Sequence, residues 1–180
     1  MGINKKMNPL RNPVAKLLKD TLKGSGRVIS GEYNGKRFLT NGTFLTIFTS
    51  ESDWKEILLE CKLEPRNGVY SFGSWADNVP DIAPIMGQAD KAIECKYLEA
   101  TLYLNNTHYH LFAANGAIYA FDEQFMALWE GFSVKQNKQM LKASDSRYTS
   151  IILAVRNMKN RDNSWNEEVK KLVESLQAPV

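Results

Sequence analysis

Three of the four Asn-Gly pairs, those at positions 34–35, 41–42 and 115–116, separate expected strands, and they constrain the fold more than any other feature of this chain. Both residues of such a pair tolerate the positive φ of a type I′ turn, which makes Asn-Gly the strongest short signal for a β-hairpin. Apolar, β-prone segments flank each pair, so consecutive antiparallel strands are expected. The expected strands of the two meanders are about 27–33, 36–40 and 43–49, then 93–104, 108–114 and 117–121.

Apolar stripes at helical spacing predict about four helices around these meanders. Asn12-Pro13 is expected to open the first helix, and Gly24-Ser25-Gly26 to end it. Further N-caps are expected at Ser52-Asp53, Asp122 and Ser164. The expected helices span 13–23, 53–62, 123–131 and a segment from 164 onward, with shorter strands at 69–72, near 132–134 and at 148–155. This mixture of antiparallel meanders and helices predicts the α+β class.

A chain of 180 residues with 43% hydrophobic content is sufficient for one packed domain. Residues 1–11 are predicted to form a flexible basic arm, and residues 12–180 a single α+β domain. The two meanders also suggest two parts, 12–72 and 93–180. A meander with a helix nearby thus occurs twice. Either a diverged duplication or the usual arrangement of antiparallel α+β folds explains this repetition. Residues 73–92, with Pro80 and Pro84, are expected to form a structured connection with room for one helical turn.

The sequence points to the cytoplasm, with no membrane contact. No run of 18 apolar residues is present, and the first residues lack the apolar stretch of a signal peptide. A secreted domain stabilised by disulfides would usually carry more than two cysteines, so Cys61 and Cys95 are interpreted as reduced thiols.

Charge is distributed unevenly along the chain. Residues 1–37 hold nine Lys and Arg against two acidic residues, a net +7, whereas the remainder holds 14 basic and 18 acidic residues, a net −4. This asymmetry predicts a surface that faces a polyanion; a solvated, lysine-rich helix is the alternative. The candidate binding residues are Lys5, Lys6, Arg11, Lys16, Lys19, Lys23, Lys36 and Arg37.

Trp75 completes the set of candidate binding residues. It lies in the loop-like segment 73–78, where an exposed aromatic side chain would suit a partner's pocket or the stacking of a base. The alternative is that this side chain folds back over the core.

No catalytic constellation is recognisable, so the chain is predicted not to be an enzyme and to need no metal or cofactor. The sequence lacks a phosphate-binding glycine loop, a nucleophile elbow and a converging set of carboxylates. His108 and His110 would share one face of a strand and so could share a zinc ion, with Glu94 and Cys95 as the nearest further ligands. No ligand-spaced motif joins them, and a strand that merely exposes imidazole is the alternative.

Three segments resemble parts of a known family. Residues 37–49 (RFLTNGTFLTIFT) resemble the strand, Asn-Gly, strand opening of small phage-type proteins. Residues 79–86 (VPDIAPIM) resemble the connector of bacterial sliding clamps, and residues 148–156 (YTSIILAVR) resemble their terminal strand, with Ala154 where a Pro is usual. The family is that of DNA polymerase processivity clamps and their small phage and mobile-element relatives, although this chain is shorter than a full clamp.

The resemblance implies curved sheets outside and basic helices facing DNA, with Lys16, Lys19 and Lys23 in that inner role. The expected function is therefore a non-enzymatic, sliding-clamp-like accessory protein that binds double-stranded DNA non-specifically. By analogy of size, the alternative is an anti-CRISPR-type protein, which inhibits a nucleic-acid enzyme such as a CRISPR effector nuclease. These two functions call for different partners, DNA in the first and a protein in the second.

Overall fold

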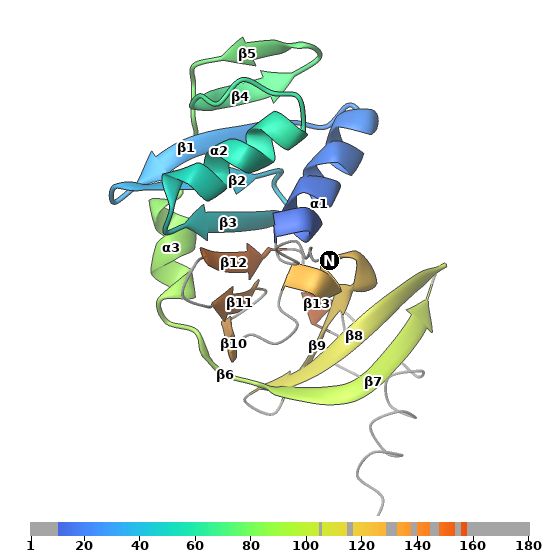
Figure 1. The fold of residues 1–180 in the computed structure, drawn as a ribbon. Helices are drawn as coiled ribbons and strands as arrows, with labels where there is room; N and C mark the ends of the chain where they lie inside the picture. Colours follow the sequence, from blue (N-terminus) through green and yellow to red (C-terminus); the bar gives the residue numbers. More distant parts are fainter. Residues whose placement is uncertain are drawn as a thin grey trace, which may run out of the picture.

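The computed structural model describes residues 11–104, 106–114, 117–128, 133–137, 140–144, 148–153 and 156–157. Within these ranges two antiparallel sheets carry three α-helices and one 3₁₀ helix (Figure 1). Every described pair of strands is antiparallel, which confirms the predicted α+β class.

The first meander follows helix α1 (Arg11–Lys23) and comprises β1 (Val28–Tyr33), β2 (Lys36–Thr40) and β3 (Phe44–Phe48). Asn34 and Gly35 have φ values of 49° and 78°, both positive as a type I′ turn requires. At the next Asn-Gly pair only Gly42 has positive φ, and the Asn41 side chain accepts the Thr43 backbone N–H at 2.9 Å. This connection is therefore an Asx turn, and only the first described pair behaves as predicted.

The larger sheet has nine strands in the order β5-β4-β1-β2-β3-β12-β11-β10-β6. Its central seam is the pairing of β3 with β12, which runs from Tyr148↔Phe48 to Ile152↔Phe44 and joins segments about a hundred residues apart. The remaining strands are β4 (Gly68–Ser71), β5 (Ser74–Ala76), β6 (Ile93–Glu94), β10 (Ser133–Asn137), β11 (Met140–Ser144) and β12 (Tyr148–Ile152).

The smaller sheet has the order β13-β9-β8-β7 and contains most of the second predicted meander. The strand expected at 93–104 is interrupted at Cys95, and its first two residues form β6 of the larger sheet instead. The turn predicted at 115–116 lies outside the described residues. The strands on either side of it, β8 and β9, pair as far as Ala114↔Ala117. The strands are β7 (Lys96–Leu104), β8 (Thr107–Ala114), β9 (Ala117–Asp122) and β13 (Arg156–Asn157).

Helix α2 (Glu51–Glu60) lies close to its expected range, but two other helices differ from the prediction. The segment expected at 123–131 is the 3₁₀ helix η2 (Glu123–Leu128), in which the buried Phe125 and Leu128 have the three-residue spacing that suits this tighter helix. The connection expected at 73–92 contains α3 (Ala83–Ala89), which has Pro84 in its first turn and buries Met86 and Ala89. Three α-helices are thus described where about four were expected, and the segment from 164 onward lies outside the described residues.

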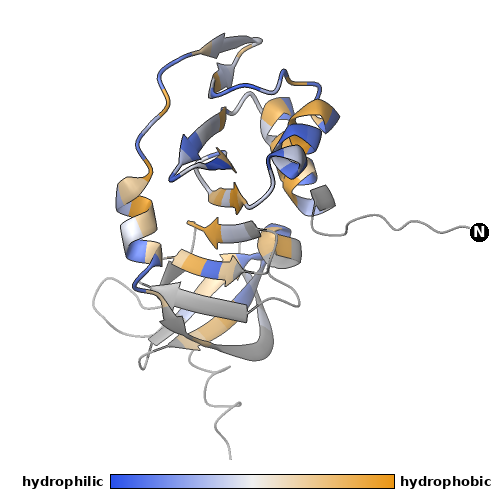
Figure 2. Ribbon diagram, turned by 60° about the vertical axis from the view of Figure 1, so that its left-hand side comes forward, coloured by the Kyte–Doolittle hydropathy of each residue, from blue (hydrophilic) through white to orange (hydrophobic). Residues whose placement is uncertain are grey.

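Side chains alternate between the two faces of the nine-stranded sheet, as the pleat of a strand requires. On one face, Leu39, Phe44 and Ile152 join a buried cluster with α1, α2, η2 and residues of the smaller sheet. On the other face, Phe38 and Ile151 join a smaller cluster with α3. Figure 2 shows α1 on one side of these strands and α3 on the other. Among the described residues, no helix combines the length and apolar character that crossing a membrane would need.

Candidate binding surface

Two of the three predicted helix lysines lie beside carboxylates. The Lys16 ammonium donates to Asp20 one turn along α1 at 2.9 Å, and the Lys19 ammonium donates to Glu60 of α2 at 3.1 Å. The hydrogen bond from Lys16 lowers the pKa of Asp20, so this carboxylate stays charged at neutral pH. Lys23 is exposed in the last turn of the same helix.

The balance of charge extends over the whole helical layer. Helix α1 carries four basic residues and one acidic residue, a net +3, and α2 carries one basic residue and four acidic residues, a net −3. The two helices pack against each other, and the Cys61 thiol just after α2 lies 3.7 Å from the Ala15 carbonyl of α1. The formal charges of the two packed helices therefore sum to zero, and the Lys19–Glu60 ion pair joins them.

Arg37 is part of the fold and is not free to bind a polyanion. Its guanidinium lies 2.8 Å from a Glu51 carboxylate oxygen and donates to the Asn67 side-chain oxygen at 2.7 Å. It also covers the Trp54 ring, with 4.4 Å from its central carbon to the ring centroid. These contacts tie β2 to α2 and to the loop that precedes β4.

The remaining predicted basic residues do not join the α1 lysines in one described patch. Lys36 lies at the start of β2 and lines a pocket beside α3, on the sheet face opposite α1. Arg11 is the first residue of α1, and only its backbone is described. Lys5 and Lys6 lie outside the described residues.

Trp75 lies in β5 and is half-buried. Its ring meets the Tyr70 ring edge-on, with 5.3 Å between centroids, and packs beside the main core cluster. The Arg66 guanidinium covers it at 5.3 Å and also forms an ion pair with Asp77. The sequence allowed Trp75 to be either an exposed binding residue or a side chain that folds back over the core, and the structure favours the second.

Phe72, which was predicted as the last residue of the strand at 69–72, lies instead just after β4 and is the most exposed large apolar side chain described, at 85%. It forms the β4–β5 turn with Gly73, and their φ values are 50° and 83°. A bulky residue with positive φ is unusual, so the chain here accepts backbone strain that places an aromatic ring in solvent. Two short β-prone segments, 69–71 and 74–76, lie on either side of Phe72-Gly73, and this pattern could have indicated the hairpin turn from the sequence.

A pocket of about 290 Å³ lies beside this ring. Leu22 of α1, Leu63 after α2, and Tyr70 and Phe72 of the hairpin line it, with Lys62 at the same site. We call the surface formed by α1, α2 and the β4–β5 hairpin the helix–hairpin surface.

The two histidines have different environments. His110 is buried, stacks on Phe121 with 5.6 Å between ring centroids, and places Nε2 3.7 Å from a Glu123 carboxylate oxygen. His108 is exposed and lies 4.7 Å from the Tyr103 ring. Among the described residues no group of three or more His, Cys, Asp or Glu side chains is placed to hold a metal ion.

The two thiols are protonated at neutral pH. Burial raises the pKa of both Cys61 and Cys95 from 9.0 to about 11. The thiolate is the nucleophilic form of cysteine, so neither residue has the environment of a reactive thiol.

Comparisons with protein-family models, curated proteins and solved structures find no match to this chain. The resemblance to sliding clamps therefore stays a prediction, and a function has to be argued from the surfaces described above.

Proposed function

We propose that this chain is a non-enzymatic binding protein that contacts another protein through its helix–hairpin surface. Phe72 carries this proposal, because a tight turn holds its ring in solvent beside a pocket that Leu22 and Leu63 help to line. Aromatic side chains supply a large share of the binding energy at protein interfaces and tend to sit in or beside such pockets. Leu59 of α2, which is 55% exposed, adds a second apolar group on the helical layer.

The charge of the helical layer supports a protein partner over DNA. Non-specific DNA binding depends on the release of counterions by unbalanced basic groups. Here the +3 of α1 meets the −3 of α2, so a duplex approaching Lys19 would also approach Glu60. Exposed ion pairs contribute only about 0–1 kcal/mol each, so phosphates could displace them, but the nearby carboxylates would remain.

Of the two functions expected from the sequence, this surface fits the protein inhibitor of a nucleic-acid enzyme better than the clamp-like DNA-binding accessory. An inhibitor needs a complementary protein surface with apolar anchors and mixed charge. An accessory that tracks DNA needs a continuous basic surface, and the described basic residues are divided between the two faces of the sheet.

Capture from host-cell lysate, with and without nuclease digestion, tests the proposal. The bait is the full chain or its Phe72→Ala variant. Tyr103→Ala is the matched control, since Tyr103 is an exposed aromatic residue, at 58%, near the end of a different hairpin. We expect one protein to be captured in stoichiometric amount after digestion, to be lost with Phe72→Ala and to be kept with Tyr103→Ala. The same protein should then be inhibited by the purified chain if it is a nucleic-acid enzyme.

Two results would count against the proposal. Capture that disappears on nuclease digestion would indicate that nucleic acid bridges the two proteins. A shift of duplex DNA at about 50 mM salt that Lys16→Glu, Lys19→Glu and Lys23→Glu together abolish would favour the DNA-binding accessory instead.

A further inference from the structure

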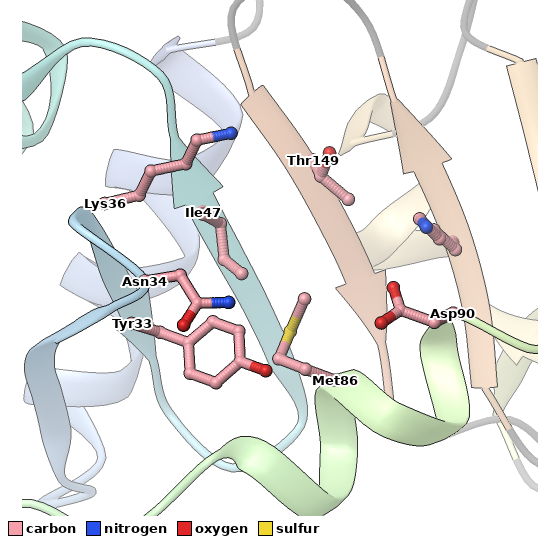
Figure 3. Close-up of a pocket in the computed structure, with 8 residues that line it drawn as sticks. Tyr33, Asn34, Lys36, Ile47, Met86, Asp90 and Thr149 are labelled. Carbon is pink, nitrogen blue, oxygen red and sulfur yellow. The ribbon is translucent and has the colours of Figure 1, made fainter.

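A second pocket, of about 220 Å³, lies on the sheet face opposite α1 and next to α3 (Figure 3). We call it the α3 pocket. Its apolar contacts come from Ile47 of β3 and Met86 of α3, and Figure 3 shows the Tyr33 ring and Met86 pointing toward each other. The polar residues that line it are Asn34, Lys36, Asp90, Lys142 and Thr149.

The strand register explains why polar groups gather here. Ile47 pairs with Phe38 on one side and with Thr149 on the other. Since side chains two residues apart share a face, Lys36 lies on the face of Phe38, and Thr149 on the face of Ile151. Lys142 pairs with Ile151 and so faces the same way.

Helix α3 covers only part of this face. It is seven residues long, and the side chains Met86 and Ala89 pack on the apolar part of the face. Beyond that part, Lys36 and Lys142 lie on the same face as Phe38 and Ile151. Lys36 is exposed and Lys142 is half-buried, so both bring positive charge next to the apolar part of the face.

The lining suits a ligand with an anionic group at one end and an apolar group at the other. The ammonium groups of Lys36 and Lys142 against the Asp90 carboxylate leave a net +1, and the Asn34 amide and the Thr149 hydroxyl add neutral donors. Lysine binds phosphate and carboxylate groups through charge-assisted hydrogen bonds. Tyr33, Ile47 and Met86 offer an apolar wall for a ring or a short carbon chain.

We propose that the α3 pocket binds a small organic anion, a phosphate or a carboxylate, whose apolar part lies on Met86 and Ile47. A volume of about 220 Å³ is below the range of drug-sized sites, so the ligand is small. The site lies away from the helix–hairpin surface and does not depend on the function proposed for that surface.

The test uses the purified full chain and phenyl phosphate, followed by NMR titration of the backbone amides. Benzoate tests the carboxylate form of the same chemistry. Inorganic phosphate supplies charge without a ring, and phenol supplies a ring without charge. We expect saturable binding of phenyl phosphate or benzoate, with a dissociation constant on the order of 1 mM for so small a ligand. The largest shifts should lie in residues 33–36, 86–90 and 148–151.

Lys36→Ala and Lys142→Ala should each weaken this binding by about tenfold, as expected for the loss of one charge-assisted contact. Lys62→Ala is the matched control, because Lys62 lines the other pocket. Each variant is first checked by its thermal midpoint. If phenol or inorganic phosphate binds as tightly as phenyl phosphate, or if Lys62→Ala weakens binding as much as Lys36→Ala, the proposal is wrong. Absence of saturation up to about 20 mM, well above the expected constant, would also overturn it.

Discussion

The two faces of the nine-stranded sheet are covered by hydrophobic clusters of different size. We call the α1 side the deep side and the α3 side the shallow side. On the α1 side, twenty buried residues from α1, α2, η2 and both sheets form one cluster. On the α3 side, the described cluster has eight buried residues and a single short helix. The helices that form the helix–hairpin surface therefore rest on a large buried cluster. On the shallow side α3 leaves part of the sheet uncovered, and the α3 pocket is lined directly by strand residues. Most of the stability of the fold should come from the α1 side.

The largest effect is expected from removing a ring on the deep side. Phe44 is fully buried in β3, and its ring lies 6.3 Å from that of Phe125. Phe44→Ala should lower the free energy of unfolding by about 3–5 kcal/mol, through lost burial and the cavity that remains. Ile47→Ala, on the shallow side of the same strand, should cost less, about 2–3 kcal/mol, since Ile47 lies at the edge of the α3 pocket.

Urea unfolding of both variants measures this difference. Leu59→Ala is the control, since this exposed residue should change stability by no more than about 0.5 kcal/mol. Equal losses for Phe44→Ala and Ile47→Ala would show that the two faces contribute alike.

Alkaline pH offers a second way to weaken the deep side, through Cys61. Its pKa is raised to about 11 by burial, against 9.0 for an ordinary thiol. Below pH 9 both the folded and the unfolded chain hold this proton, so its contribution to stability is fully present. Between about pH 9 and 11 the unfolded chain loses the proton first, and stability should fall by about 2 kcal/mol by pH 11.

Lysine and tyrosine groups titrate in the same range, so the Cys61→Ala variant provides the reference. Urea unfolding at intervals from pH 8 to 11 should give a shallower decline for this variant than for the parent chain. Parallel declines would mean that the Cys61 thiol is not protected by burial.

A third prediction concerns a buried hydrogen bond beneath α2. The indole N–H of Trp54 donates to the Ser30 hydroxyl of β1 at 2.9 Å, and both residues are buried. Ser30→Ala should cost about 1–2 kcal/mol, because the indole N–H loses its partner without access to water. In the Trp54→Phe background the same substitution should cost clearly less, and a double-mutant cycle by urea unfolding measures the difference. Equal costs in both backgrounds would rule out a contribution from this hydrogen bond.

The sequence predicted best those elements that depend on neighbouring residues. The first Asn-Gly turn and the strand at 36–40 were predicted correctly, because the positive φ and the flanking apolar residues are local properties. The same holds for the end of α1 at Lys23, which the following glycines determine.

Elements that depend on distant partners were missed. Strand β11 reads as polar, with Lys142 between Leu141 and Ala143, and becomes a strand by pairing with β12. Helix α3 was expected as no more than one helical turn in the connection at 73–92. It is seven residues long, with Pro84 in its first turn, and the apolar sheet face stabilises it from outside. The partners of the predicted basic residues are also distant, since Glu60 lies 41 positions from Lys19. No local pattern could show that the charge of α1 is balanced by α2.

That balance leads to the prediction with the smallest effect on stability. Replacing Glu56 and Glu60 of α2 with Gln keeps the size of both side chains and removes two negative charges from the helical layer. The Lys19–Glu60 ion pair is exposed, so the free energy of unfolding should change by less than about 1 kcal/mol. The layer then carries a net +2, and the double variant should bind duplex DNA more tightly than the parent chain at about 50 mM salt. Its binding should also depend more steeply on salt, by about 0.9 in the logarithmic slope for each phosphate newly contacted. Gel shifts across a salt series measure both quantities, with Glu64→Gln, an exposed acidic residue beyond α2, as the control. If the parent chain already binds DNA as tightly and as salt-dependently as the double variant, the carboxylates of α2 do not oppose DNA binding. In that case the basic helix itself would be the better candidate for the binding site.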